Sequence, residues 1–302
     1  MSQYLNPKND YIFKRVFGEH KHLCISLINS MLPLDNPVVS IEYQTSELIP
    51  ELEVLRNSIV DVRCIDTAGR QFIVELQLHW YDSFKKRVLF NASKAYVMQL
   101  NAAEEFKLLQ PVYSLNFINE IFEKSPEMTD DYFHHYKIVN IRDTGKQIKG
   151  LEFVFIELPK FKPSNRAEKK LHELWLRYLT EINEKSEKIA QELLENEYIR
   201  EAIGYIERGA YTMNQLMTYD KLKIDTMSAL SMLDDAEERG LEKGLERGLE
   251  KGEALGFAKG ETERTLLKAE KEATEAELKA EKAEKATLLA RIAELERLQS
   301  GN

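Results

Sequence analysis

Two neighbouring segments of the chain alternate apolar and polar residues, which is the pattern of half-buried β-strands. They cover residues 58–65 and 71–78, and a short turn that contains Gly69 joins them. A pairing that places Val62 opposite Val74 puts the apolar residues of both strands on one face, whereas a slip of one residue would turn one set outward. The two segments therefore predict a β-hairpin with a fixed register.

The same register brings two carboxylates together on the other face of the hairpin. Asp61 would lie opposite Glu75, with Gln77 beside them. Directly opposed side chains in a sheet lie roughly 4.5–5.5 Å apart, and like charges at that spacing are destabilising. Two acids in this position indicate a site for a cation. The alternative is a pair of solvated carboxylates in a hairpin of another register.

The length of 302 residues, 43% of them hydrophobic, allows one domain with a full core and an additional segment. The sequence contains no run of 18 apolar residues that would span a membrane, and its opening residues lack the apolar segment of a signal peptide. Cys24 and Cys64 show no metal-binding spacing. We therefore expect a reduced, cytoplasmic protein with no membrane partner.

The net charge of −9 is opposite to that of a general polyanion-binding protein. Contact with a nucleic acid would therefore require a local basic patch on an otherwise acidic chain. A bound metal ion would offset part of the negative charge at the predicted cation site.

The body of the chain reads as an α/β domain. A first helix is expected from Asn9 or Asp10, either of which could cap it. Further helices are expected at 21–31 and 82–109, and strands at 38–43, 59–65, 72–79, 112–117, 132–141 and 151–158. A helix that crosses over after a hairpin indicates a mixed sheet flanked by helices.

Four domains follow from the changes in composition along the chain. Residues 1–163 form the α/β core, and residues 164–235 a helical subdomain or arm with cap candidates at Ser164, Ser186 and Asp220. Residues 236–260 carry a glycine at every fourth position, and residues 261–302 form a coiled-coil helix. The expected partner of this last helix is another copy of the chain, which would make a homo-oligomer; the alternative is a lone solvated helix.

Several segments, in order, resemble the recombination-promoting nuclease or putative transposase family of the PD-(D/E)XK nuclease superfamily. They are the opening segment 6–18, Asp61 followed by Glu75-Leu76-Gln77, the helical segment 87–100, the segment Glu157-Leu-Pro-Lys-Phe161 and the glycine-repeat tail. The resemblance covers nearly the whole chain.

The resemblance implies a restriction-endonuclease-like fold and a metal-dependent endonuclease that hydrolyses phosphodiester bonds of DNA, in recombination or in the activity of mobile elements. It implies Mg²⁺, with Mn²⁺ as a substitute, held by Asp61 and Glu75. The carbonyl of Leu76 could supply a third oxygen, and such ligands suit Mg²⁺, which keeps several waters.

One residue departs from the superfamily pattern. Its usual lysine is replaced by Gln77, which cannot carry a positive charge or act as a base. Lys94 or Arg87, on the helix after the hairpin, could supply the missing cation, and Lys94 is the better candidate. Asp10 could enter the metal site from the first helix, although helix capping alone would explain it. The competing interpretation is a catalytically weak scaffold that keeps the nuclease fold and binds partners through its coiled coil.

Overall fold

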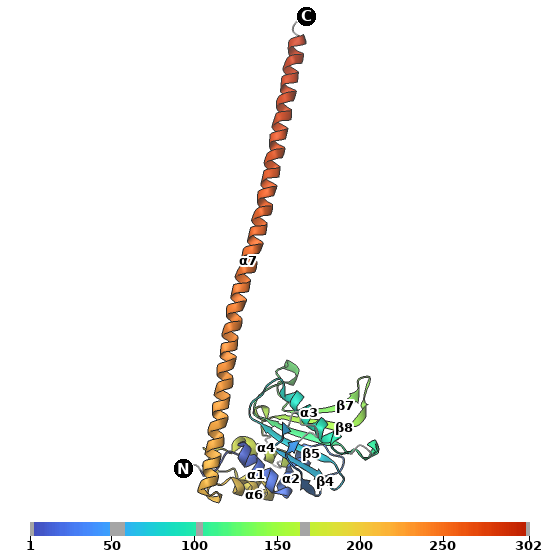
Figure 1. Cartoon of the computed structure of the whole chain (residues 1–302), viewed down its shortest axis with the longest axis vertical. Coiled ribbons are helices and arrows are strands. Elements are labelled where there is room, and N and C mark those ends of the chain that lie inside the picture. Colours follow the sequence, from blue (N-terminus) through green and yellow to red (C-terminus); the bar gives the residue numbers. More distant parts are fainter. Residues whose placement is uncertain (1–2, 49–57, 101–104, 164–169, 300–302) are drawn as a thin grey trace. The chain divides into compact units, whose positions relative to one another are not determined.

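The computed structural model describes residues 3–48, 58–100, 105–163 and 170–299. Contacts divide the chain into two compact units, Met1–Ser228 and Ala229–Asn302. The first unit contains a mixed six-stranded sheet in the order β1-β4-β5-β6-β8-β7 and a small two-stranded sheet, β2-β3 (Figure 1). The strands are β1 (Ile41–Tyr43), β2 (Glu47–Leu48), β3 (Ser58–Ile59), β4 (Val62–Asp66), β5 (Gln71–Gln77), β6 (Val112–Ile118), β7 (Phe133–Asn140) and β8 (Asp143–Glu157).

Helices cover both faces of the large sheet, which confirms the predicted fold class. They are α1 (Asp10–Glu19), α2 (Lys21–Met31), α3 (Phe84–Val97), α4 (Leu171–Glu181), α5 (Gln191–Glu195), α6 (Glu197–Ile206) and α7 (Met213–Gln299). The side chain of Asn9 accepts a hydrogen bond from the Tyr11 N–H, so Asn9 rather than Asp10 caps α1.

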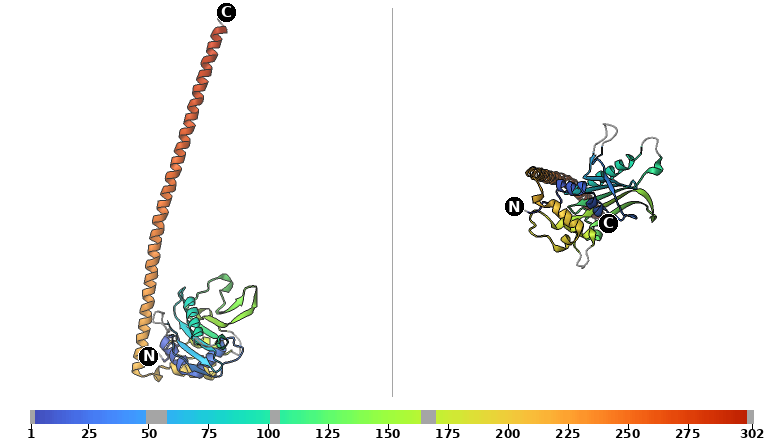
Figure 2. Two further views of the ribbon diagram at one scale, coloured as in Figure 1. Left: turned by 45° about the vertical axis from the view of Figure 1, so that its right-hand side comes forward. Right: turned by 90° about the horizontal axis from the view of Figure 1, so that it is seen from below.

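The two faces of the sheet belong to different hydrophobic clusters. Phe72 and Val74 pack with apolar residues of α1 and α2, whereas Ile73 packs with Ala92 and Ala95 of α3. Figure 2 gives two further views of the helices around the sheet. The prediction of a half-buried hairpin is therefore wrong, because α3 covers the face that the sequence pattern left to solvent. This second layer buries polar residues of β5 as well as apolar ones.

The first strand of the predicted hairpin is interrupted. β3 pairs with β2 in the small sheet, and β4 begins only at Val62, so the chain leaves one sheet and enters another between these strands. Val60 consequently packs in the cluster under α3 instead of with Val62 and Cys64. The break places Asp61 at the entry to β4, beyond the last paired residue.

The helix predicted at 82–109 is shorter in the structure, where α3 ends at Val97. The side chain of Gln99 pairs with the backbone of Gln110 in both directions, accepting from its N–H at 2.8 Å and donating to its carbonyl at 2.9 Å. These two bonds fix the chain just before β6 and satisfy backbone groups outside the helix.

Helices α4 and α6 share one core with the sheet instead of forming an arm. Trp175 and Leu179 of α4 and Ile203 of α6 lie in the same buried cluster as Phe17 of α1. The start of α7 also belongs to this unit, where the Tyr219 hydroxyl accepts the Asn6 N–H at 3.2 Å.

Two of the three predicted helix caps are wrong, and one falls outside the described residues. Ser186 lies in the connection that follows α4 and does not precede a helix directly, whereas Asp220 lies inside α7. Ser164 is outside the described residues.

The second unit consists of the remainder of α7, in which the helix runs through all six regularly spaced glycines, Gly240 to Gly260. Nearly every side chain from residue 229 to residue 293 is exposed. No helix within the described ranges is both long and apolar enough to cross a membrane.

Candidate active site

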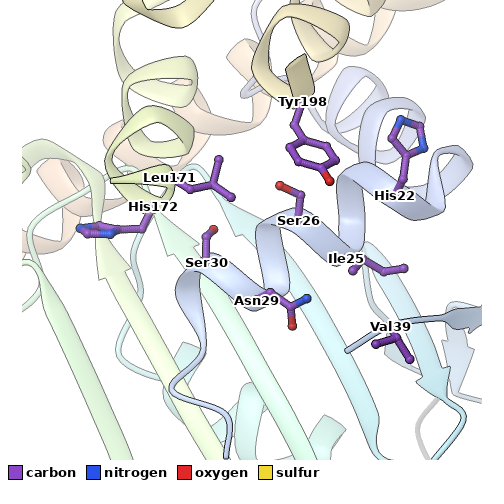
Figure 3. A pocket seen from close by; sticks show the side chains of 9 residues that line it. All are labelled: His22, Ile25, Ser26, Asn29, Ser30, Val39, Leu171, His172 and Tyr198. Carbon is purple, nitrogen blue, oxygen red and sulfur yellow. The ribbon is translucent and has the colours of Figure 1, made fainter. Parts of the chain in front are cut away.

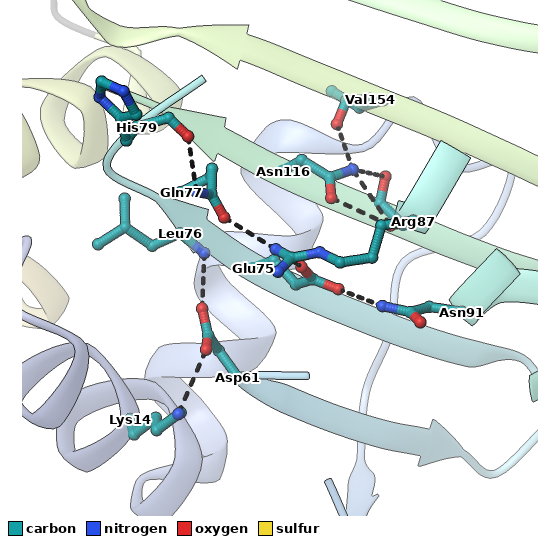
Figure 4. Close-up of polar contacts among 11 residues, drawn as sticks. Lys14, Asp61, Glu75, Leu76, Gln77, His79, Arg87, Asn91, Asn116 and Val154 are labelled. Carbon is teal, nitrogen blue, oxygen red and sulfur yellow. Dashed lines mark hydrogen bonds and ion pairs between the residues drawn. The ribbon is translucent and has the colours of Figure 1, made fainter. Parts of the chain in front are cut away.

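The predicted register of the hairpin is confirmed, because Val62 pairs with Val74 in the antiparallel β4–β5 ladder. The ladder ends at this pair. Asp61 lies one residue before it and Glu75 one residue after it, so the two acids come together where the strands begin to separate (Figure 4).

Asp61 is held by the strand next to it and by the first helix. Its Oδ2 accepts the Leu76 N–H at 2.8 Å, and its Oδ1 lies 3.4 Å from Nζ of Lys14. The same lysine lies 3.0 Å from Oδ2 of Asp10, one turn earlier on α1. The side chain of Asp61 is 17% exposed, so its carboxylate is largely but not completely removed from water.

Glu75 is held from the opposite face, by α3. Asn91 donates to its Oε1 at 3.1 Å, and Nη2 of Arg87 lies 3.3 Å from its Oε2 (Figure 4). The Glu75 side chain is only 4% exposed. Both donors come from one face of one helix, so α3 fixes the position of both carboxylate oxygens.

Burial opposes ionisation of both acids. Burial, reinforced by the charges of Asp10 and Glu75, raises the pKa of Asp61 to about 7, against the Leu76 N–H and Lys14, which lower it. Burial also raises the pKa of Glu75, although Arg87 and Asn91 act in the other direction. The fold therefore concentrates more negative charge here than its own cations neutralise.

Gln77 is fixed at the end of β5 by two hydrogen bonds. Its Oε1 accepts from Nη2 of Arg87 at 2.8 Å, and its Nε2 donates to the His79 carbonyl at 2.6 Å. One guanidinium thus contacts both Glu75 and Gln77. Among the described residues, the buried Nε of Arg87 has no hydrogen-bond partner, so this cation keeps one donor uncommitted.

Of the two cations predicted on α3, the structure shows Arg87 in contact with the acid pair. Lys94 lies farther along the helix, with its ammonium 5.4 Å from the centre of the Phe90 ring. Lys14 was not among the residues predicted from the sequence, although a signal was present. Lys14 follows Asp10 by four residues in the predicted first helix, and residues four apart share a helix face.

The donor set fits a divalent cation that prefers oxygen ligands. Each oxygen of a carboxylate has two lone pairs, so Asp61 and Glu75 keep acceptor capacity after the bonds described above. The Leu76 carbonyl points to the same edge of β5 as its N–H, which is the edge that faces Asp61. Within the described residues no three His, Cys, Asp or Glu side chains gather. Two acids and a carbonyl suit Mg²⁺, which usually retains waters, better than a metal that requires a full protein cage.

One cavity of the first unit, of about 340 Å³, is lined by residues that include Tyr11, Lys14, Tyr43, Asp61 and Arg63, so it reaches Asp61 from the side of α1. Another, of about 500 Å³, lies between α2, α4 and α6 (Figure 3). Several of its polar side chains bind the protein itself: Ser26 accepts from Trp175, Asn29 bonds to the backbone of Val38, and His22 pairs with Glu201.

Residues 7–235 match the family described as PD-(D/E)XK nuclease family transposase, and the chain belongs to this family. The mixed sheet with flanking helices agrees with the nuclease fold of the family. Comparisons with curated proteins and with solved structures gave no match.

Proposed function

We propose that the chain is a divalent-metal-dependent deoxyribonuclease that hydrolyses phosphodiester bonds within DNA, in recombination or in the movement of mobile elements. The observation that carries the proposal is the pair Asp61 and Glu75, buried, held from opposite faces of the sheet and left with an excess of negative charge. Family membership supports the same reading, because it implies a nuclease acting on DNA.

Asp61, Glu75 and the Leu76 carbonyl would hold Mg²⁺, with Mn²⁺ as a substitute. The metal would lower the pKa of a water molecule and withdraw charge from the scissile phosphate. Lys14 and Arg87 are the cations that the structure places at the acids. They would stabilise negative charge on the phosphate, the role that Gln77 cannot perform. In the hydrolysis a water oxygen bonds to phosphorus, and the departing sugar oxygen takes up a proton.

Plasmid cleavage tests the proposal. Supercoiled DNA is incubated with the full chain in Mg²⁺, in Mn²⁺ and in EDTA, and nicked and linear products are measured. We expect cleavage only with metal, and a loss of at least about 100-fold in Asp61→Asn and in Glu75→Gln, because each replaces a charged ligand with a neutral one. Asn can still accept the Leu76 N–H, so Asp61→Asn keeps that hydrogen bond.

Glu42→Gln, at an exposed position of β1, is the matched control and should cleave like the parent. Cleavage by Asp61→Asn or Glu75→Gln at the parental rate would remove these residues from the site. A folded parent that cleaves no DNA, whichever metal is added, would favour the scaffold interpretation, in which the long helix binds partners.

A further inference from the structure

Basic residues outnumber acidic ones in two segments of the otherwise acidic chain, α3 and the outer part of the β7–β8 hairpin. Helix α3 has four basic residues and no acidic one, and the turn of the β7–β8 hairpin with its adjoining strands, residues 137–149, has four basic residues and one acidic one. By contrast, residues 171–211 carry nine acidic and five basic residues. The two basic segments thus differ in charge from α4–α6 within a chain whose net charge is −9.

The outer part of the β7–β8 hairpin forms a two-stranded ribbon, which we define as residues 138–149. β8 pairs with β6 only from Leu151 onward, so the ribbon has no neighbour in the sheet and projects beyond it (Figure 1). Every residue of the ribbon is exposed. Shifts of register after Lys137 and after Val139 mark the place where it leaves the sheet.

Helix α3 connects the candidate active site to this ribbon. Arg87 and Asn91 contact Glu75, and Tyr96, near the last residue of the helix, packs against Gly150 at the base of the ribbon. A Cβ on Gly150 would lie 3.4 Å from the Tyr96 hydroxyl oxygen, so the glycine permits this close approach. A helix of 14 residues is roughly 21 Å long, so α3 spans the distance between the acid pair and the base of the ribbon.

The ribbon cations are available to an external ligand. Arg142, Lys146 and Lys149 are exposed, and so is Lys86 on α3. Lys146 lies 3.4 Å from Asp143 and Lys149 lies 3.6 Å from Asp35, but all four of these side chains are more than half exposed. Ion pairs of this kind contribute little to stability and exchange readily for other anions.

We propose that the ribbon, through Arg142, Lys146 and Lys149, binds the phosphate backbone of the duplex DNA that the acid pair cleaves. This inference rests on the proposed nuclease function. The charge of the ribbon is complementary to DNA, and a two-stranded β-ribbon has dimensions that the major groove admits. Ile141, at the tip, is 95% exposed, and it would lie against the DNA.

Binding of a labelled 30-base-pair duplex, followed by fluorescence anisotropy in EDTA over a series of KCl concentrations, tests the proposal without requiring cleavage. The test variant is Arg142→Gln/Lys146→Gln/Lys149→Gln. The control is Lys21→Gln/Lys185→Gln/Lys188→Gln, which removes the same charge from exposed positions away from α3 and the ribbon. Circular dichroism melts verify that both variants fold.

We expect the test variant to bind at least about 10-fold more weakly than the parent, with a salt dependence whose slope is smaller by roughly 3, about one for each lost phosphate contact. The control should bind within about twofold of the parent. Parental binding by the test variant, equal losses in both variants, or no binding by the parent would each overturn the proposal.

Two further results separate this proposal from others. If Ile141→Ser/Ile148→Ser lowers the molecular mass in solution and leaves DNA binding unchanged, the surface joins two copies of the chain and the DNA proposal is wrong. If the parent binds DNA through the ribbon but cleaves none with any metal, the nuclease function fails and the binding surface stands.

Discussion

Asp61 occupies a position that destabilises the folded chain when its carboxylate is charged. The pKa of Asp61 is raised to about 7, whereas an unperturbed aspartic acid titrates near 3.9. The folded state therefore binds the proton more tightly than the unfolded state. The contribution of Asp61 to the free energy of unfolding is therefore most favourable below about pH 4. It diminishes as the pH rises from about 4 to 7 and is lost above that range.

We predict that Asp61→Asn raises the melting temperature of the metal-free protein at pH 8 by several degrees. The substitution removes a buried, repelled charge and keeps an acceptor for the Leu76 N–H, and 1 kcal/mol corresponds to about 2–4 °C in a domain of this size. Differential scanning calorimetry in EDTA measures the change, with Glu42→Gln as the control. Added Mg²⁺ should stabilise the parent and not Asp61→Asn. An unchanged or lowered melting temperature would show that Asp61 is not strained in the fold.

The segment that begins at Glu157, one of those that carry the family resemblance, has a structural role. Glu157 is completely buried at the end of β8. It accepts hydrogen bonds from the backbone N–H groups of Phe122 and Glu123, from Nε2 of His134 at 2.8 Å, and it lies 2.7 Å from Nζ of Lys160. Burial alone would raise the pKa of Glu157, but these donors, led by Lys160, outweigh it and lower the pKa.

We predict that Glu157→Gln destabilises the chain by about 3 kcal/mol at pH 7, because it leaves the buried Lys160 ammonium without its anionic partner. The lowered pKa means that the parent gains this stability above the unfolded value near 4.3 and loses it as the pH falls through the folded value. Urea unfolding at pH 7 and pH 3 should therefore show a large difference from the parent at pH 7 and a small one at pH 3. Equal differences at the two values would contradict an ionised Glu157.

At the scale of elements, the sequence predicted the helices and strands that local residue patterns define and missed features that depend on packing against a distant element. The predicted bounds of α2 agree with the structure at both ends, and the register of the hairpin followed from its apolar faces. The burial of Glu75 could not be predicted, because alternation does not reveal whether a helix covers the second face. The outer part of β8 was missed because its polar, glycine-containing sequence lacks an apolar pattern.

The same distinction applies to the candidate site. Asp61 and Glu75 were identifiable from register alone, and Lys14 could have been found by its helical spacing from Asp10. The contact of Arg87 with Glu75 depends on how α3 is rotated on the sheet, which side chains of distant elements determine. For that reason the sequence favoured Lys94.

At the scale of the whole molecule, α7 exposes a row of leucines. Leu241, Leu245 and Leu249 are each more than 60% exposed and recur at intervals of four residues. Six glycines in the same stretch weaken an isolated helix by about 1 kcal/mol each relative to alanine. We propose that association of copies along this helix compensates for that loss.

We predict that truncation after Ala236 yields a folded protein whose particles in solution contain fewer subunits than those of the full chain. The first unit ends at Ser228, so the truncation leaves its contacts intact. Light scattering coupled to size exclusion measures the mass, and the melting temperature of the truncated chain monitors its fold. The same number of subunits before and after truncation would rule out the tail as the element of assembly.

The shifts of register at the base of the β7–β8 ribbon allow the ribbon to vary independently of the rest of the sheet. An insertion or deletion beyond Lys137 can be absorbed in the ribbon, while the pairing of β6 with β8 and the position of Glu75 remain as they are. The length and composition of the ribbon are therefore free to diverge, or to be exchanged by an engineer, without disturbing the catalytic geometry. Under the proposed function, such exchanges would change the affinity for DNA and leave the acid pair as it is.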